Sequence, residues 1–382
     1  MSRKPIPQER FHALIRVVYD GHYAPEDLHT YGPLEDWDVS EIEDMSEAFS
    51  GYARFNWDIS RWDVSRVTNM RRMFSQATSF NRSLASWNVA RVTNMEAMFY
   101  AAQSFNRPLE NWDVGQVTDM REMFAWCTVF NQPLGRWNTS SVTRMDGMFM
   151  CTRAFRQSLE GWDTSSVTHM NCMFYHARGF NAPLGAWDVS RVTNMNAMFC
   201  SASVFNQPLE GWNVSRVTSM REMFFDAWSF NQPLGRWDVG QVTNMARMFS
   251  RARVFDQPLG RWNVSRVTTM REMFYNAPRF NQPLERWDVG RVEDMSMIVY
   301  GAQAFRQPLE RWDVSAAKRM HWHCAALDRR RRRLQAFWRP PLQAAASDVH
   351  VLRLPFDNTL RFFEVAAETE VEAEVESGPR AA

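Results

Sequence analysis

The sequence predicts an α/β repeat solenoid of about twelve coils, each built from a short parallel β-strand and a short helix. Tryptophan recurs every 25 residues without interruption, from Trp37 to Trp312. The surrounding residues repeat with it, as in FNQPLGRWDVGQVTNMARMF at 230–249. A strict period of this length, without insertions, is typical of chains in which each repeat forms one coil stacked on the next.

The first half of each coil has the pattern of a strand. In the copy at 205–230, Trp212 and Val214 alternate with polar residues, which is the period of a strand with one buried face. Strands of successive coils would pair in parallel about 4.8 Å apart, in a rod or arc of roughly 60 Å. The Trp, Phe and Met side chains would then stack on their equivalents, and their burial would dominate stability at roughly 1.5–3 kcal/mol each.

The second half of each coil has the spacing of a helix. Its apolar residues lie three and four apart, at Val217, Met220, Met223, Phe224 and Ala227. Thr218 is placed as the N-cap of this helix. One coil is therefore expected to be a strand, a tight corner and a short helix.

The chain is expected to have four parts. Residues 1–30 are predicted to form an N-terminal helical cap, because Phe11, Leu14 and Ile15 belong to one apolar helix pattern. Residues 31–325 are the repeats. Residues 326–365 form a basic segment and a C-terminal cap, and residues 366–382 a glutamate-rich tail that is expected to be disordered.

The bulk composition excludes several classes of protein. The net charge is +1, so no global field favours nucleic acid or a membrane surface. No apolar run approaches the roughly 18 residues that span a bilayer, and the N-terminus has no signal peptide, so a cytoplasmic location is expected, in the host cytoplasm if the protein is viral. The five cysteines follow no repeat and are interpreted as free thiols of a reducing compartment.

The repeat LxxWDVSxVTNMxxMFxxAxxFNQP resembles the BspA-like leucine-rich-repeat surface proteins over about residues 31–325. That family is abundant among mycoplasmal lipoproteins and occurs in bacteria, protists and large DNA viruses. The resemblance implies a right-handed, leucine-rich-repeat-like solenoid with roles in adhesion or protein binding. Because this chain lacks the signal peptide and lipobox cysteine of the secreted members, an origin in a protist or large DNA virus is the expectation.

Each coil carries Asp or Asn directly after its Trp, from Asp38 to Asp313. Stacked carboxylates could bind metal ions. Asn replaces Asp in four copies, however, so the shared property is an acceptor oxygen rather than a charge. We expect a hydrogen bond from this side chain to the backbone of the corner.

Four successive coils carry arginine directly before the Trp, at Arg236, Arg261, Arg286 and Arg311. Stacked guanidinium groups repel unless something neutralises them. We favour a salt-bridged mesh with the aspartates two residues further on, at Asp238, Asp288 and Asp313, to which Glu285 and Glu310 could contribute. The alternative is a contact patch for an anionic or acidic protein.

Aromatic residues occur at variable, outward places of the expected helices. They include Trp126, Tyr175, Phe225 and Trp228. Such residues could form a partner-binding patch or pack partly against the next helix, and the sequence favours neither.

Catalytic and metal-binding patterns do not stand apart from the repeat. His169, Cys172 and His176 would share one helix face, but no second ligand pair supports a metal site. We therefore expect no enzyme activity, no metal and no cofactor.

The favoured hypothesis is a non-enzymatic protein–protein interaction scaffold, with a protein partner and no small-molecule substrate. One alternative is a surface or adhesion protein of the BspA-like type. Another is a nucleic-acid-associated protein that uses Arg329–Arg333, a run that could also be a nuclear-import element. Nucleic acid is the less favoured partner, because a basic helix end that meets acidic groups explains the run equally simply.

Overall fold

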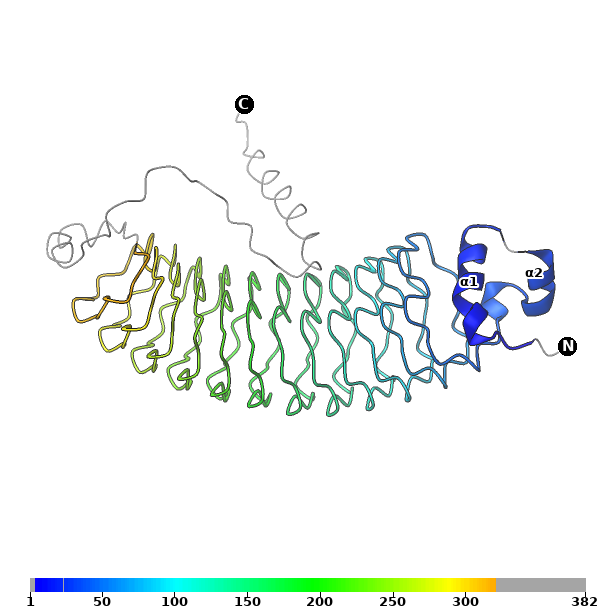
Figure 1. Cartoon of the computed structure of the whole chain (residues 1–382), viewed down its shortest axis with the longest axis horizontal. Coiled ribbons are helices and arrows are strands. Elements are labelled where there is room, and N and C mark those ends of the chain that lie inside the picture. The colour runs from blue at the N-terminus through cyan, green and yellow to red at the C-terminus, as the bar shows by residue number, and fades with distance from the viewer. Residues whose placement is uncertain (1–3, 23, 321–382) are drawn as a thin grey trace, which may run out of the picture. The chain divides into compact units, whose positions relative to one another are not determined.

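A computed structural model describes residues 4–22 and 24–320 (Figure 1). The chain divides into two compact units, Met1–Leu334 and Gln335–Ala382, and every described residue lies in the first. The predicted features at Arg329–Arg333, 326–365 and 366–382 lie outside the described residues.

The N-terminal segment forms α1 (Gln8–Tyr19), α2 (Pro25–Tyr31) and a short 3-10 helix, η1 (Leu34–Asp36). The predicted N-terminal helix is present as α1. Its apolar residues are buried in the same core as the coils, and the Phe11 ring meets the edge of Trp62 at 5.9 Å. Helix α1 therefore covers the apolar interior of the first coils.

Two side chains of α1 bind the backbone of the first coil. The Gln8 Oε1 atom accepts hydrogen bonds from the N–H groups of Glu43 and Asp44 at 2.9 Å, and Gln8 Nε2 donates to the Asp44 carbonyl at 2.7 Å. One turn later, His12 Nε2 lies 2.7 Å from the Ser46 carbonyl oxygen. In later coils the preceding coil bonds to the same backbone groups. These are the N–H at the place of Glu43 and the carbonyls at the places of Asp44 and Ser46. Gln8 and His12 therefore satisfy the backbone groups of the first coil that a preceding coil satisfies elsewhere.

The prediction of an α/β solenoid with a parallel sheet is wrong. From residue 37 to residue 320 the chain forms neither a regular strand nor a helix. Successive coils are instead joined by isolated parallel bridges, one per pair, from Asp44↔Asn69 to Asp294↔Arg319. The right-handed leucine-rich-repeat class, with its strand and helix in every coil, therefore does not describe this chain.

The predicted strand around Trp212 is a pair of turns. The Trp212 N–H donates to the Leu209 carbonyl at 3.0 Å, and the Val217 N–H donates to the Val214 carbonyl at 2.9 Å. Trp212 and Val214 are buried, as the alternation predicts. The alternation was correct about burial, but turns rather than a strand produce it.

The predicted helix at 217–227 is a run of turns whose N–H groups point in two directions. Met220, Glu222, Phe224 and Asp226 donate to carbonyls of the next coil, 24 residues further on. The N–H groups of Met223, Phe225 and Ala227 instead donate to carbonyls three residues earlier. An α-helix would bond every N–H four residues back within the segment. Successive three-residue turns place apolar residues inward at almost the same spacing, which is why the sequence resembles a helix here.

Thr218 is not an N-cap. Its hydroxyl donates to the Thr193 carbonyl of the preceding coil at 3.1 Å, and so does its backbone N–H at 2.9 Å. The repeated threonine therefore joins coils rather than starting a helix.

Two positions in each coil adopt the left-handed backbone conformation. Glu222 has φ 58° and Asp226 has φ 54°, and their equivalents from residue 47 to residue 301 all have positive φ. Only three of these places are occupied by glycine, at Gly51, Gly147 and Gly301. A left-handed residue with a side chain costs roughly 1–2 kcal/mol. From residue 47 to residue 276, the N–H of each such residue donates to a carbonyl of the next coil at 2.6–2.9 Å. These hydrogen bonds offset the conformational cost.

The interior consists of aromatic stacks that run from coil to coil. Phe224 lies 5.6 Å from Phe249, and Trp212 lies 6.4 Å from Trp237, both measured between ring centroids. The predicted stacking of Trp and Phe on their equivalents is confirmed. The indole N–H of each of the twelve repeat tryptophans also donates to a backbone carbonyl, as in the 2.9 Å bond from Trp212 Nε1 to the Leu184 carbonyl.

Candidate functional site

The Asp and Asn side chains that follow each Trp, the Asp/Asn column, bond to the backbone of the corner, as predicted. Asp238 Oδ1 accepts from the Gly240 N–H at 3.0 Å, and all twelve copies make the same bond to the residue two further on. The described residues contain no group of three or more His, Cys, Asp or Glu side chains that could hold a metal ion. The column is therefore structural.

The predicted arginine column lies at the surface. Arg236, Arg261, Arg286 and Arg311 are all exposed. Arg236 Nε lies 3.5 Å from Glu210 Oε1 of the preceding coil. Arg136 pairs with Glu110 in the same way, at 3.3 Å. None of the ion pairs found among the described residues joins this column to the aspartates two residues further on, and the pairs at Arg136 and Arg236 are made with glutamates of the preceding coil.

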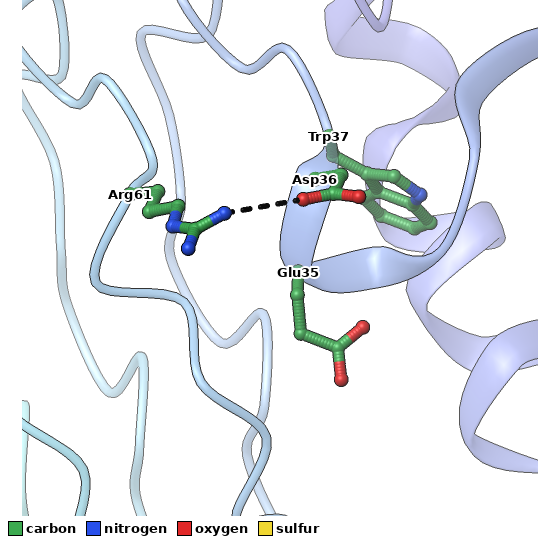
Figure 2. A pocket seen from close by; sticks show the side chains of 4 residues that line it. All are labelled: Glu35, Asp36, Trp37 and Arg61. Carbon is green, nitrogen blue, oxygen red and sulfur yellow. Dashed lines mark ion pairs between the residues drawn. The ribbon is translucent and has the colours of Figure 1, made fainter.

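A shallow pocket lies at the first coil, beside Arg61, which occupies the same place in its coil as Arg236. Figure 2 shows its four lining residues, Glu35, Asp36, Trp37 and Arg61. Arg61 Nη1 lies 3.9 Å from Asp36 Oδ1, and the Arg61 side chain is 85% exposed. Trp37 is buried, and its indole N–H donates to the Gly32 carbonyl. The pocket thus contains a long, solvated ion pair, which is not the geometry of a ligand site.

The four predicted aromatic residues do not form one patch. Trp126 and Tyr175 are half-buried and belong to other coils than Phe225 and Trp228. The Tyr175 ring lies 4.5 Å from that of His176, and burial raises the Tyr175 pKa above its usual range. For Tyr175 the partial-packing interpretation is therefore the better one.

Trp228 is the centre of a surface cluster. It is 40% exposed, whereas the twelve repeat tryptophans are 2–7% exposed. Its indole N–H donates to Asp226 Oδ1 at 2.6 Å, and the Arg253 guanidinium lies over its ring at 3.8 Å from the centroid. An aspartate on one side and an arginine of the next coil on the other hold this indole in one orientation at the surface.

Phe225 extends the cluster. The guanidinium carbon of Arg251 lies 5.6 Å from its ring centroid, so two arginines of one coil cover two aromatic rings of the coil before it. Cation–π contacts of this kind contribute roughly 0.5–1 kcal/mol each at exposed sites. Phe225, Asp226, Trp228, Arg251 and Arg253 are named here the Trp228 cluster.

The sequence did not single out Arg251, Arg253 and Asp226. A simple signal was available, because a residue stacks on the one 25 positions earlier. Arg253 follows Trp228 by 25 residues, and Arg251 follows Asp226 by the same interval. Pairing the columns in this way places Arg253 beside the Trp228 ring and Arg251 beside Asp226, next to Phe225.

Charges are mutually compensated on a second surface, the bridge face, formed by the residues equivalent to 219, 221 and 222. Arg121 Nη2 lies 2.7 Å from Glu96 Oε2, and Arg247 Nε lies 2.8 Å from Glu272 Oε2. Arg271 reaches the same glutamate at 2.9 Å. Arginine and carboxylate thus alternate from coil to coil and neutralise each other.

The middle of the bridge face is less charged and more buried. Burial raises the pKa of Glu122 and of Asp146 above their usual values, and the Glu96 charge adds to the effect on Glu122. Burial also raises the pKa of the Cys172 thiol on this face to about 12, and that of the Tyr100 hydroxyl, at the place of Phe225, to about 12. Ionisation is thus disfavoured here, which argues against a thiolate nucleophile or a metal site.

The four cysteines within the described residues, Cys127, Cys151, Cys172 and Cys200, are not in disulfides. Cys127 occupies the place of a small residue and points its sulfur at the Phe99 carbonyl oxygen, at 2.8 Å. His169 Nδ1 contacts the Thr168 hydroxyl at 2.9 Å rather than a metal-ligand set. The fifth cysteine, Cys324, lies outside the described residues.

The coil-to-coil bonds define a 25-residue unit that recurs through the described residues. A model of the family described as Mycoplasma protein of unknown function, DUF285, matches residues 23–135, 107–209, 183–278 and 218–337. The chain belongs to this family. As a DUF285 protein it is a repeat protein, and the overlapping matches follow from its repeats.

No curated protein matches this DUF285 chain. Among the described residues, no helix has the length and apolarity required to cross a membrane.

Proposed function

We propose that this DUF285 protein is a non-enzymatic scaffold that binds another protein through the Trp228 cluster. The supporting observation is the 40% exposed indole of Trp228, held between Asp226 and Arg253. Trp and Arg are the residue types that most often carry binding energy at protein interfaces. An indole whose orientation is already fixed loses little conformational entropy when a partner covers it.

The rest of the described surface supports binding rather than catalysis. The carboxylates of the Asp/Asn column bond to corner backbone groups, and the arginines of the bridge face pair with carboxylates. A catalytic site needs unlike groups that converge on one reacting atom. Stacked coils instead offer an extended surface, which is how repeat proteins bind partners.

Site-specific photo-crosslinking in the source cell tests this proposal. A photoreactive amino acid at position 228 should give a discrete adduct with a second protein. The same amino acid at position 261, an exposed place in the arginine column, is the matched control and should give none. Arg253→Ala should reduce the adduct at position 228. Adducts at 261 alone would place the site on the predicted arginine column, and no adduct at either position would contradict a binding role for the Trp228 cluster.

The BspA-like surface or adhesion role is the second candidate. It is supported by the resemblance of the repeat and by membership in the same broad group of mycoplasmal repeat proteins. Fractionation separates the two candidates. The scaffold proposal, which includes a cytoplasmic location, expects the protein in the cytoplasmic fraction, and the adhesion candidate expects it at the cell surface.

A further inference from the structure

One edge of the coils carries a large excess of positive charge. This edge, named here the Phe edge, is the seven-residue segment around the Phe that closes each coil, residues 226–232 and their equivalents from 51–57 to 301–307. These eleven segments contain ten arginines, no lysine, and only two acidic residues, Asp226 and Asp256. The chain as a whole carries a net charge of only +1, so the charge is unevenly distributed.

The arginines of the Phe edge differ from those of the bridge face in their partners. Nine of the ten are exposed. Arg82 Nε and Arg107 Nε donate to backbone carbonyls of the preceding coil at 2.7 and 2.9 Å, and Arg306 Nη1 donates to two carbonyls close to it in the sequence. Arg251 and Arg253 lie over aromatic rings. These contacts are made to carbonyls and aromatic rings rather than to carboxylates, so they orient the guanidinium groups without neutralising them.

The same edge also exposes apolar side chains. Val129 is 45% exposed, Val204 is 43% exposed and Trp228 is 40% exposed. A phosphodiester backbone would gain nothing from valine, because phosphate contacts are electrostatic and polar. Protein interfaces, by contrast, combine apolar anchors with arginine. The combination favours a polypeptide over a nucleic acid.

We propose that the Phe edge binds an extended acidic polypeptide segment with interspersed apolar residues. This inference rests on the proposed function and adds the chemistry of the partner. Eleven coils about 4.8 Å apart span roughly 50 Å, which matches about 15 residues of extended chain. The partner's carboxylates would bind the exposed guanidinium groups, and its apolar side chains would cover Trp228 and Val204.

Two charge-matched variants of the full chain test the proposal. The edge variant is Arg251→Gln, Arg253→Gln and Arg279→Ser, and the column variant is Arg236→Ser, Arg261→Ser and Arg286→Ser. Every replacement already occurs at the equivalent place of another coil, at Gln76, Gln103, Ser79 and Ser86. Each variant loses three positive charges, and equal thermal midpoints would show that both fold.

The probe is a fluorescein-labelled peptide of about 15 residues, glutamate with leucine at intervals. Fluorescence anisotropy should show binding by the wild type and about tenfold weaker binding by the edge variant. The column variant should bind like the wild type, and added salt should weaken binding in both. Equal loss in both variants, or no binding by the wild type, would overturn the proposal.

A single-stranded oligonucleotide of equal charge is the second probe. The peptide should bind more tightly, and tighter binding of the oligonucleotide would overturn the assignment to a polypeptide. The photo-crosslink at position 228 keeps the two proposals separable. If it persists while the acidic peptide does not bind, the scaffold function stands and the acidic chemistry is wrong.

Discussion

The indole N–H of Trp187 donates a 3.0 Å hydrogen bond to the carbonyl oxygen of Leu159 in the preceding coil. The same indole stacks on Trp162 at 6.2 Å between ring centroids and is only 3% exposed. Each repeat tryptophan from Trp62 on therefore fills the interior of its own coil and donates a hydrogen bond to a carbonyl 28 residues earlier.

Replacing Trp187 with Ala should lower the free energy of unfolding by about 3–5 kcal/mol, because it opens a cavity and removes one of the two donors to the Leu159 carbonyl, which keeps only the Trp162 N–H at 3.1 Å. Chemical denaturation measures the loss. Trp228→Ala is the control and should cost less than about 1 kcal/mol, because that indole is already partly in water. An unchanged unfolding midpoint for Trp187→Ala would contradict the interior role of the column.

Gln76→Gly should stabilise the protein by about 0.5–1 kcal/mol. Gln76 is exposed and has φ 59°, and glycine adopts that conformation without the steric cost of a side chain. Gly51 and Gly301 already occupy the equivalent place. Gln76→Val should destabilise, since a β-branched residue fits this conformation worst.

Gln103 supplies the control for that experiment. It is exposed like Gln76 but is not among the residues with positive φ. Gln103→Gly should therefore lower the unfolding free energy by about 0.5–1 kcal/mol. Thermal unfolding that showed the same sign for both glycine variants would argue against the left-handed columns.

Asp146 should make stability fall as the pH rises. The group is 8% exposed, and burial raises its pKa in the folded state above the usual aspartate value. Below the ordinary pKa of about 3.9, Asp146 is protonated in both states and has no effect. As the pH rises from the ordinary pKa towards the raised pKa, the unfolded chain ionises first and the folded state is progressively destabilised; above the raised pKa the loss is constant.

Asp146→Asn removes this titration. The difference in unfolding free energy between variant and wild type should shift in favour of the variant from pH 3 to pH 7. The Arg144 Nε to Asp146 Oδ2 contact of 3.1 Å opposes this shift, so Arg144→Gln in the wild type should enlarge it. A difference that does not change with pH would show that Asp146 titrates normally in the folded protein.

Gln8→Ala should destabilise the first coils by about 1–3 kcal/mol. The change removes three hydrogen bonds to Glu43 and Asp44, and no preceding coil exists to replace them. Hydrogen exchange should show faster exchange at residues 43–46 than in the wild type. Glu9→Ala, on the exposed side of α1, is the control and should leave that exchange unchanged.

The sequence was informative about burial and poor about backbone conformation. Trp212, Val214 and Phe224 are buried where the period placed them, because burial depends on which side chains are apolar. The conformation of 217–227 could not be inferred in the same way. Three-residue turns and an α-helix both place Met220 and Met223 inward, and the left-handed conformation of Glu222 leaves no trace in a residue type that rarely adopts it.

The candidate site was predictable in part for a similar reason. Trp228 stood out because a large aromatic residue at a variable place is unusual. Its exposure and its contact with Arg253 depend on how coil stacks on coil, and the expected strand-and-helix coil misplaced those neighbours. The arginine column beside the Trp was found by its regularity, yet the structure shows no cluster there that resembles the one around Trp228.

The contacts of Gln8 and His12 also bear on self-association. An uncovered first coil would present unpaired backbone groups in the register that another molecule's coil could complete, which is how repeat ends and strand edges polymerise into filaments. The side chains of Gln8 and His12 bond to those backbone groups. They do not themselves present a row of backbone donors and acceptors to which another coil could bind. Growth of a head-to-tail fibre at this end would first have to displace α1, so we expect removal of the helix, rather than mutation of any coil, to promote polymerisation most strongly.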